Sequence, residues 1–242
     1  MSVNTVIRDA WVIFKKDIKI DRMLLLFSFL FMGYTGVSMS MFIGNLYHDQ
    51  NQFILMADIM LLIIIPMLGF YFSKKSFKYL TDDSYTQMLI YLRTLPISPK
   101  VIMCYRYIQM LIALTMNSVI VFSIIYGFSS QLRSEIFIGN YICFALTWIG
   151  YALGVTGIYI HLEFTNSGRK YFWLTMVMIV IKVIVAFTIW SLGGNLVMYT
   201  MEMSNEWGVL SPVMWGALVG GMISLASLGR VTFRRLQHRD LL

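Results

Sequence analysis

The sequence predicts an all-α membrane protein with six transmembrane helices. Of its 242 residues, 58% are hydrophobic and only 13% are charged, whereas soluble globular domains contain about 45–50% apolar and about 25% charged residues. Six apolar stretches are each close to the roughly 20 residues that a helix needs to cross a bilayer. Basic residues are concentrated in alternate gaps between these stretches, which is typical of a chain that crosses the membrane repeatedly.

The gaps between the spans predict the topology. The six predicted spans cover residues 23–45, 53–73, 107–129, 137–160, 172–194 and 209–229. All but two of the 19 Lys and Arg residues lie before the first span, after the last, or in the second and fourth gaps; the exceptions are Arg133, in the third gap, and Lys182, inside the fifth span. The positive-inside rule therefore predicts a multi-pass protein of the cytoplasmic membrane with both termini cytoplasmic. We interpret residues 1–242 as a single transmembrane domain.

The net charge of +7 does not predict a nucleic-acid partner. In a soluble protein such a balance would suggest one. Here the excess basic residues flank the predicted spans, so topology and attraction to anionic lipid account for it. We expect membrane lipid as a partner and no nucleic acid.

Residues 5–22 predict an amphipathic helix in front of the first span. Its apolar positions, near helical spacing, are Val6, Ala10, Ile13, Phe14 and Ile18. Charged residues occupy most of the remaining surface, and a basic amphipathic helix beside a span is expected to lie in the plane of the headgroups. We therefore expect an interfacial elbow helix on the cytoplasmic side.

Pro66 interrupts the second predicted span. Proline has no N–H to donate, so the carbonyl four residues earlier, on Leu62, loses its helical partner. We expect a kink at this position.

The second gap contains a short helix of its own, predicted for residues 84–95. The run Thr81-Asp82-Asp83-Ser84 offers N-caps for this helix, and Pro96 ends it because the residue before a proline is pushed out of the α region. Ser98 and Pro99 then have the pattern of an N-cap and first residue, so the third helix is expected to begin on the cytoplasmic side.

The fifth gap, residues 193–212, is too apolar for a solvated loop and too interrupted for another span. Its apolar residues include Leu196, Val197, Met198, Tyr199, Met201, Met203 and Trp207. We interpret it as a re-entrant or interfacial segment on the outer face, where surrounding protein would bury its backbone.

No catalytic residue, metal site or nucleotide site is predicted. His48, His161 and His238 lie in three separate segments without metal-binding spacing. The sequence has neither a Gly-x-Ser-x-Gly nucleophile elbow nor a Gly-x-x-x-x-Gly-Lys-(Ser/Thr) phosphate loop. We therefore expect that this chain is not an enzyme and holds no cofactor.

Asp58 and Lys182 are the only ionisable residues well inside predicted spans. Such residues are costly in a bilayer and are candidate functional residues by default. One interpretation is a polar patch on a substrate path. The other is structural: a buried pair that the long Lys182 side chain bridges, or an Asp58 that reaches outward.

Small residues recur at four-residue spacing and allow close helix approach. Gly36, Ser40 and Gly44 form such a stripe in the first span, Gly150 and Gly154 in the fourth, and Gly216, Gly220 and Ser224 in the sixth. Packing within the chain explains most of these stripes. The first span is the best candidate for a subunit interface.

One motif carries a family resemblance. The segment Thr94-Leu95-Pro96-Ile97-Ser98-Pro99-Lys100, followed by Val101, Ile102 and the Arg106-bearing start of a span, resembles the permease subunits of type-2 ATP-binding-cassette (ABC) exporters. Their typical pattern between the second and third spans is Leu-Pro-(Ile/Val/Leu)-Ser-x-basic. With the elbow, six spans and apolar outer segment, the resemblance covers nearly the whole chain.

The resemblance implies a permease that dimerises with a second copy or a paralogue. Each permease would bind one separate ABC ATPase, two copies per complex, which holds the ATP and Mg. The coupling helix that contacts the ATPase would be residues 84–95, with a docking surface of Tyr85, Met88, Leu89, Tyr91, Leu92 and Arg93. Dimers of the family meet largely through the first and fifth spans, which makes Gly36, Ser40 and Gly44 candidate dimer-interface residues.

We therefore expect the transmembrane subunit of an ATP-driven ABC exporter for an amphiphilic substrate, such as a peptide, an antibiotic or a lipid-like molecule. An alternative is a secondary transporter or channel that uses Asp58 and Lys182 as an intramembrane relay. The lack of broken inner spans with paired polar residues in the sequence argues against it. A third alternative, a non-transporting membrane enzyme or sensor subunit, lacks catalytic residues.

Overall fold

The predicted all-α fold class is confirmed. The computed structural model describes residues 3–44, 46, 51–70, 72–73, 83–94 and 97–238, and every regular element within them is a helix. The elements are α1 (Val3–Ile20), α2 (Arg22–Gly44), α3 (Asn51–Ile64), η2 (Ile65–Gly69), α5 (Ser84–Thr94), α6 (Pro99–Phe128), α7 (Ser130–Glu135), α8 (Ile138–Thr165), α9 (Gly168–Ser191), α10 (Leu196–Trp207), η3 (Gly208–Leu210) and α11 (Pro212–His238).

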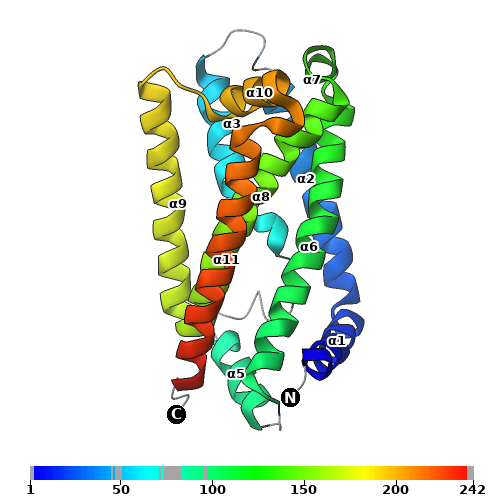
Figure 1. Ribbon diagram of the computed structural model, residues 1–242, viewed down its shortest axis with the longest axis vertical. Helices are drawn as coiled ribbons and strands as arrows, with labels where there is room; N and C mark the ends of the chain where they lie inside the picture. The colour runs from blue at the N-terminus through cyan, green and yellow to red at the C-terminus, as the bar shows by residue number, and fades with distance from the viewer. Residues whose placement is uncertain are drawn as a thin grey trace.

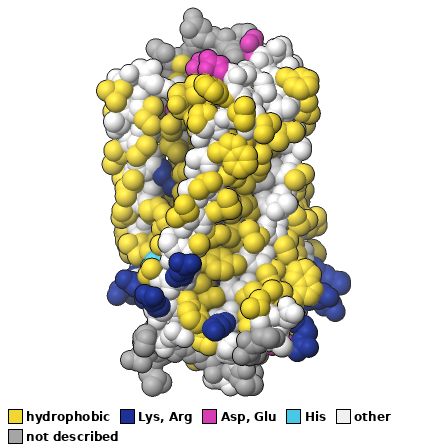
Figure 2. Space-filling model, viewed as in Figure 1, with side chains coloured by type: hydrophobic (Ala, Val, Ile, Leu, Met, Phe, Trp, Pro, Cys, Tyr) yellow, Lys and Arg dark blue, Asp and Glu magenta, His cyan; other side chains and the backbone are white. Residues whose placement is uncertain are grey.

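Five of the described helices are long and apolar enough to cross a bilayer, namely α2, α6, α8, α9 and α11. They run along the long axis of the molecule, and α3 lies beside them (Figure 1). Hydrophobic side chains cover much of the visible surface between the two ends (Figure 2). The chain is therefore a multi-pass membrane protein.

The two ends of the bundle differ in charge. Both termini, α1 and α5 lie at one end, and α7 and α10 at the other (Figure 1). Lys and Arg side chains gather towards the first end and acidic ones at the second (Figure 2). Exposed residues of the first, here called the basic end, include Lys15, Lys16, Lys19, Arg22, Arg169, Lys170, Arg230 and Arg234; those of the second, the acidic end, include Glu135, Glu202 and Glu206. This separation is the one that the alternating gaps predict.

Close packing between α8 and α11 forms much of the bundle. A Cβ atom at Gly150 would lie 2.5 Å from the carbonyl carbon of Ala217, and one at Gly221 would collide with the carbonyl oxygen of Gly150. At Gly154 it would lie 3.5 Å from the Cα of Gly221. The small residues predicted to pack within the chain in the fourth span therefore do so. In the sixth span Ser224 donates to the Gly154 carbonyl at 3.3 Å, but a Cβ atom at Gly216 or Gly220 would meet nothing within 4 Å, so packing within the chain does not account for these two glycines.

The second predicted span is broken at Pro66. Helix α3 ends at Ile64, η2 turns more tightly over Ile65–Gly69, and Phe70 is extended, with φ −118° and ψ 153°. The interruption at the proline is confirmed, but the expectation of one helix over residues 53–73 is wrong, because the described residues Phe70, Phe72 and Ser73 are not helical.

Side chains of neighbouring helices bond the backbone groups that this break releases. Pro66 has no N–H to donate to the Leu62 carbonyl. This carbonyl instead accepts a 2.9 Å hydrogen bond from the Tyr151 hydroxyl. The Asn117 amide donates to the carbonyls of Leu68 and Phe70 at 2.9 and 3.0 Å. Non-helical backbone at membrane depth persists only where protein or water satisfies it in this way.

Other predicted elements lie close to their expected positions. The segment 5–22 forms α1, the segment 84–95 forms α5, and the next helix begins at Pro99 with Ser98 as its extended N-cap, as predicted. Within the outer segment 193–212, residues Leu196–Trp207 form α10 and Gly208–Leu210 form η3.

The small residues of the first span do not form a free surface. A Cβ atom at Gly36 would lie 3.1 Å from the Cβ of Ile124 on α6, and one at Gly44 would lie 3.0 Å from the hydroxyl of Ser129. Ser40 is buried on the same side. The proposal of Gly36, Ser40 and Gly44 as dimer-interface residues is thus corrected: α6 of the same chain, with the residues that follow it, already covers this stripe.

Candidate functional site

A layer of polar and aromatic side chains, buried except for the half-buried Phe70, crosses the bundle on the basic side of the break. Its members, here called the polar layer, are Phe70, Arg106, Tyr159, Glu163 and Lys182. Arg106 on α6 donates to Glu163 on α8 from Nη2 at 2.8 Å and from Nε at 3.1 Å. Both bonds end on the Oε2 atom of Glu163, and Nε also donates to Oε1 at 3.3 Å. Charge-assisted hydrogen bonds of this kind are among the stronger ones in proteins. They join α6 to α8.

Two aromatic rings connect this ion pair to Lys182. The Arg106 guanidinium lies 5.3 Å from the centre of the Phe70 ring. That ring meets Tyr159 edge to face, with centroids 5.8 Å apart. The Nζ atom of Lys182 donates to the Tyr159 hydroxyl at 3.0 Å and lies 5.2 Å from the ring centre. The layer therefore links α6, α8, α9 and the extended end of the second span.

The polar layer carries one uncompensated positive charge. Glu163 neutralises Arg106, but Lys182 is only 6% exposed and, among the described residues, has no carboxylate within ion-pair distance. A buried cation without a counter-charge is costly. Lys182 is therefore the group in this layer best suited to meet an anionic ligand.

Asp58 has a different role at the other end of the bundle. Its carboxylate, fully buried, accepts hydrogen bonds from the backbone N–H groups of Leu196 at 2.9 Å and Val197 at 3.0 Å. Asn195 also donates to the Ile54 carbonyl at 3.4 Å. A carboxylate at a helix N-terminus satisfies free N–H groups and the helix dipole. Asp58 therefore anchors α10 to α3.

The structural interpretation in which the Lys182 side chain bridges to Asp58 is wrong. Each of the two side chains has its own partners, and they form no ion pair with each other. Sequence depth alone suggested proximity, but the two residues face different helices.

Helix α5 turns part of its apolar surface inward. Leu89 is 1% exposed, so its place on the predicted docking surface is wrong. Met88 is only partly buried against the same core, and its place on the docking surface stays a prediction. The side chain of Tyr91 is 57% exposed and that of Ile90 is 40% exposed, so both face away from the core. The side chains of the other three predicted docking residues, Tyr85, Leu92 and Arg93, lie outside the described part of the chain.

Asp83 ties α5 to α9. Its backbone carbonyl accepts a 3.0 Å hydrogen bond from the N–H of Gln87 in the first turn of α5. Its carboxylate, however, accepts a 2.7 Å hydrogen bond from the N–H of Gly168, the first residue of α9. The sequence predicts Asp83 as a cap of its own helix; the structure also uses it to cap another.

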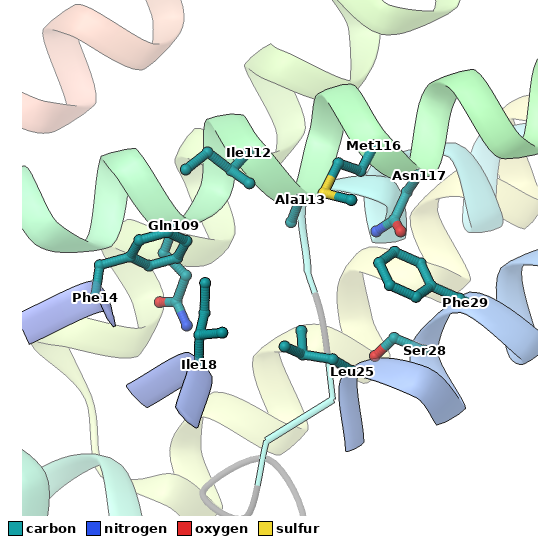
Figure 3. A pocket seen from close by; sticks show the side chains of 10 residues that line it. All are labelled: Phe14, Ile18, Leu25, Ser28, Phe29, Gln109, Ile112, Ala113, Met116 and Asn117. Carbon is teal, nitrogen blue, oxygen red and sulfur yellow. The ribbon is translucent and has the colours of Figure 1, made fainter. Parts of the chain in front are cut away.

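A pocket of about 250 Å³ lies between α1, α2 and α6. Phe14, Ile18, Leu25, Ser28, Phe29, Gln109, Ile112, Ala113, Met116 and Asn117 line it (Figure 3). Most of these side chains are apolar, and they come from all three helices (Figure 3).

A larger groove of about 640 Å³ runs between α6 and α8 on the half nearer the acidic end. Apolar residues such as Phe122 and Ile142 line most of it. The Ser118 hydroxyl in its wall is buried and lacks a hydrogen-bond partner among the described residues.

The described residues contain no group of three or more His, Cys, Asp or Glu side chains that could hold a metal ion. The site therefore consists of charged, hydroxyl and aromatic groups. Such groups can bind and orient an amphiphile and can respond to relative movement of the helices.

Several residues of the polar layer were missed by sequence reasoning. The predicted fourth span ends at residue 160 and leaves Glu163 outside it, but α8 continues to Thr165 and buries Glu163. Arg106 stands at the predicted start of a span, among the basic residues of the second gap. The sequence does carry one signal for this pair. Glu163 is a single acidic residue in a short basic gap next to a long apolar stretch.

Comparison of the chain with protein-family models, with curated proteins and with solved structures finds no match.

Proposed function

We propose that this protein is the membrane subunit of an ATP-driven ABC exporter, working with a separate ATPase at its basic end. The observation that carries the proposal is the environment of α5. This short helix exposes Ile90 and Tyr91 at an end of the bundle, and Asp83 fastens its start to α9. An element that docks a partner needs such an exposed apolar anchor together with a connection to the spans.

The arrangement of the remaining elements supports the same proposal. We count residues 54–69, with the extended segment that follows, as a sixth span beside the five long helices. Both chain ends then lie on one side, together with α1 and α5, and the positive-inside rule makes the basic end cytoplasmic. Helix α10 lies on the opposite side, between the last two spans.

The contacts suggest how movement would reach the substrate. A displacement of α5 by the ATPase would be transmitted to the start of α9 through the hydrogen bond of Asp83 with Gly168. Lys182 lies about 21 Å further along the same helix, at about 1.5 Å per residue. Displacement of α9 relative to α8 would lengthen the contact between Lys182 and Tyr159, and so alter the polar layer with each ATPase cycle.

The substrate class that fits this layer is an amphiphile. A peptide, an antibiotic or a lipid-like molecule would place its apolar part among the spans and an anionic group near Lys182. A charged residue inside a span is the usual mark of such a path.

Helix α9 offers the best surface for a second copy or a paralogue. Its exposed side chains include Trp173, Val177, Val180, Ile181, Ile184 and Phe187. This apolar face and the exposed face of α2 would replace the small-residue stripe as the dimer contact.

Co-purification tests the proposal. The tagged chain, expressed at native level in its own host, should bring down an ABC ATPase. Tyr91→Glu should reduce the recovered ATPase at least several-fold, because a charge at an apolar anchor opposes docking. Tyr199→Glu on α10 is the matched control, since Tyr199 is 50% exposed at the other end. Recovery of the chain without an ATPase, or equal loss in both variants, would contradict the proposal.

The broken second span favours a second candidate, a secondary transporter or channel. Interrupted helices beside polar residues are typical binding sites in such proteins. Since both oxygens of Asp58 are bonded to α10, a relay would run through Lys182 and Tyr159 instead. This candidate requires flux driven by an ion gradient in proteoliposomes without nucleotide.

A further inference from the structure

The pocket between α1, α2 and α6 lies where an interfacial helix meets the spans. Phe14 and Ile18 reach it from α1, Leu25 and Phe29 from α2, and Met116 from α6 (Figure 3). Helix α1 lies at the basic end, beside the lower part of α2 and α6 (Figure 1). For an interfacial helix that lies in the plane of the headgroups, this position corresponds to the first acyl carbons below them.

The polar side chains in the pocket wall are already bonded to other parts of the protein. Ser28 donates to the Leu24 carbonyl at 3.1 Å and accepts from the Phe72 N–H. Asn117 donates to two carbonyls of the broken span. Gln109 accepts from Arg106 at 3.1 Å. What remains towards the pocket is an apolar surface, which suits a hydrocarbon chain.

Positive charge lies directly beside this apolar surface. Each of the two pocket residues of α1 is followed in the sequence by an exposed lysine, Lys15 after Phe14 and Lys19 after Ile18. Consecutive residues of a helix are about 100° apart, so both lysines lie on the same side of the pocket face of α1. The Nζ atom of Lys15 lies 5.8 Å from the centre of the Trp11 ring. Lys16 and Arg22 are also exposed there. This is the charge pattern that retains anionic headgroups.

We propose that the pocket binds one acyl chain of an anionic phospholipid whose headgroup contacts Lys15 and Lys19. The lipid is a resident ligand and not the cargo, so the inference does not rest on the proposed transport function. Its acyl chain lies against Ser28 and Asn117, which hold the extended end of the second span. Occupancy therefore stabilises both the position of α1 and this non-helical segment.

The test uses the purified full chain and phosphatidylglycerol with a photoreactive diazirine in one acyl chain. Crosslinks located by mass spectrometry should concentrate on the pocket residues of α1, α2 and α6. Phosphatidylcholine with the same chains should label them at least several-fold less. Labelling spread evenly over the exposed faces of α9 and α11, or equal labelling by the two lipids, would overturn the proposal.

Variants separate the headgroup from the acyl chain. The triple change Lys15→Gln, Lys16→Gln and Lys19→Gln should weaken retention of phosphatidylglycerol about tenfold or more, since each basic residue near an anionic surface contributes to attraction. Native mass spectrometry measures the retained lipid. Unchanged retention by the triple variant would exclude the headgroup contact.

Filling the pocket should also displace the lipid. Ala113→Leu adds bulk inside it, and Ala226→Leu makes the same change on the exposed face of α11. We expect the first to lose most pocket crosslinks and the second to keep them. Met116→Trp, at a partly lipid-facing residue with 47% exposed, provides a second filling variant should Ala113→Leu fold poorly. Full pocket labelling in a folded filling variant would overturn the proposal.

Discussion

The carboxylate of Asp83 accepts a 2.7 Å hydrogen bond from the backbone N–H of Gly168. One residue thereby joins the start of α5 to the start of α9. Asp83 also adopts a left-handed backbone conformation, with φ +45°, which few residue types tolerate but aspartate does.

Replacing Asp83 tests this connection. Asp83→Ala removes the cap of α9 and should destabilise the protein by about 1 kcal/mol, the usual effect of losing a helix cap. Under the proposed function, it should also uncouple ATP hydrolysis from transport, although the ATPase still binds. Asp83→Asn keeps the accepting oxygen and should behave nearly as wild type. Thermal unfolding and transport per ATP hydrolysed are the measurements; equal coupling in Asp83→Ala would refute the connection.

The ion pair between Arg106 and Glu163 should be sensitive to removal of one partner. Glu163→Gln leaves a buried guanidinium without its counter-charge, and breaking such a pair typically costs about 3–5 kcal/mol. The double variant Arg106→Gln, Glu163→Gln should be clearly more stable than the single one. Chemical unfolding in detergent gives both values, and a double variant no better than Glu163→Gln would argue against the pairing.

Lys182 should be dispensable for stability but not for function. A buried cation without a carboxylate gains little from its charge, so Lys182→Met should unfold at or above the wild-type temperature. Under the proposed function, the same variant should lose transport of an anionic amphiphile and retain more of a neutral analogue. A strongly lowered unfolding temperature would show instead that Lys182 is structural.

Asp58 should hold α10 in place. Asp58→Ala leaves the N–H groups of Leu196 and Val197 without acceptors, which costs about 1–3 kcal/mol for a buried group. Amide hydrogen exchange should accelerate in the first turn of α10 and remain unchanged in α6. Equal protection in the variant would show that Asp58 does not anchor the helix.

The glycines of the α8 and α11 contact provide a paired test. Gly150→Ala places a methyl group against the backbone of Ala217 and should destabilise the protein by about 1–3 kcal/mol through overpacking. Gly220→Ala, with nothing within 4 Å of its added carbon, should be neutral or stabilising because alanine favours the helix. The measurement is the unfolding temperature of each variant relative to wild type. Similar changes in the two variants would contradict the observed contact.

Local features of the sequence predict the elements well. The helix start at Pro99 and the break at Pro66 depend on residues close together in the chain, and the structure agrees with both. Span ends are predicted less well, since α3 stops at Ile64 and α8 continues to Thr165. The amphipathic period of the N-terminal segment likewise predicts α1. Such signals are local because they come from hydrophobic length and from the missing N–H of proline.

Partners distant in sequence could not be predicted in this way. Arg106 and Glu163 are 57 residues apart, and only the packing of α6 on α8 brings them together. The partner of Asp58 is backbone of α10, which carries no side-chain signature. A charge inside a span shows that some partner is needed, but the choice of partner depends on tertiary structure.

Transport by the reconstituted native complex tests the central claim most directly. Flux of a fluorescent amphiphile across proteoliposomes would be followed after addition of ATP and Mg, with no ion gradient present. The account predicts flux that depends on ATP hydrolysis and disappears when the ATPase is removed. Flux that needs no nucleotide and follows an imposed ion gradient would contradict it.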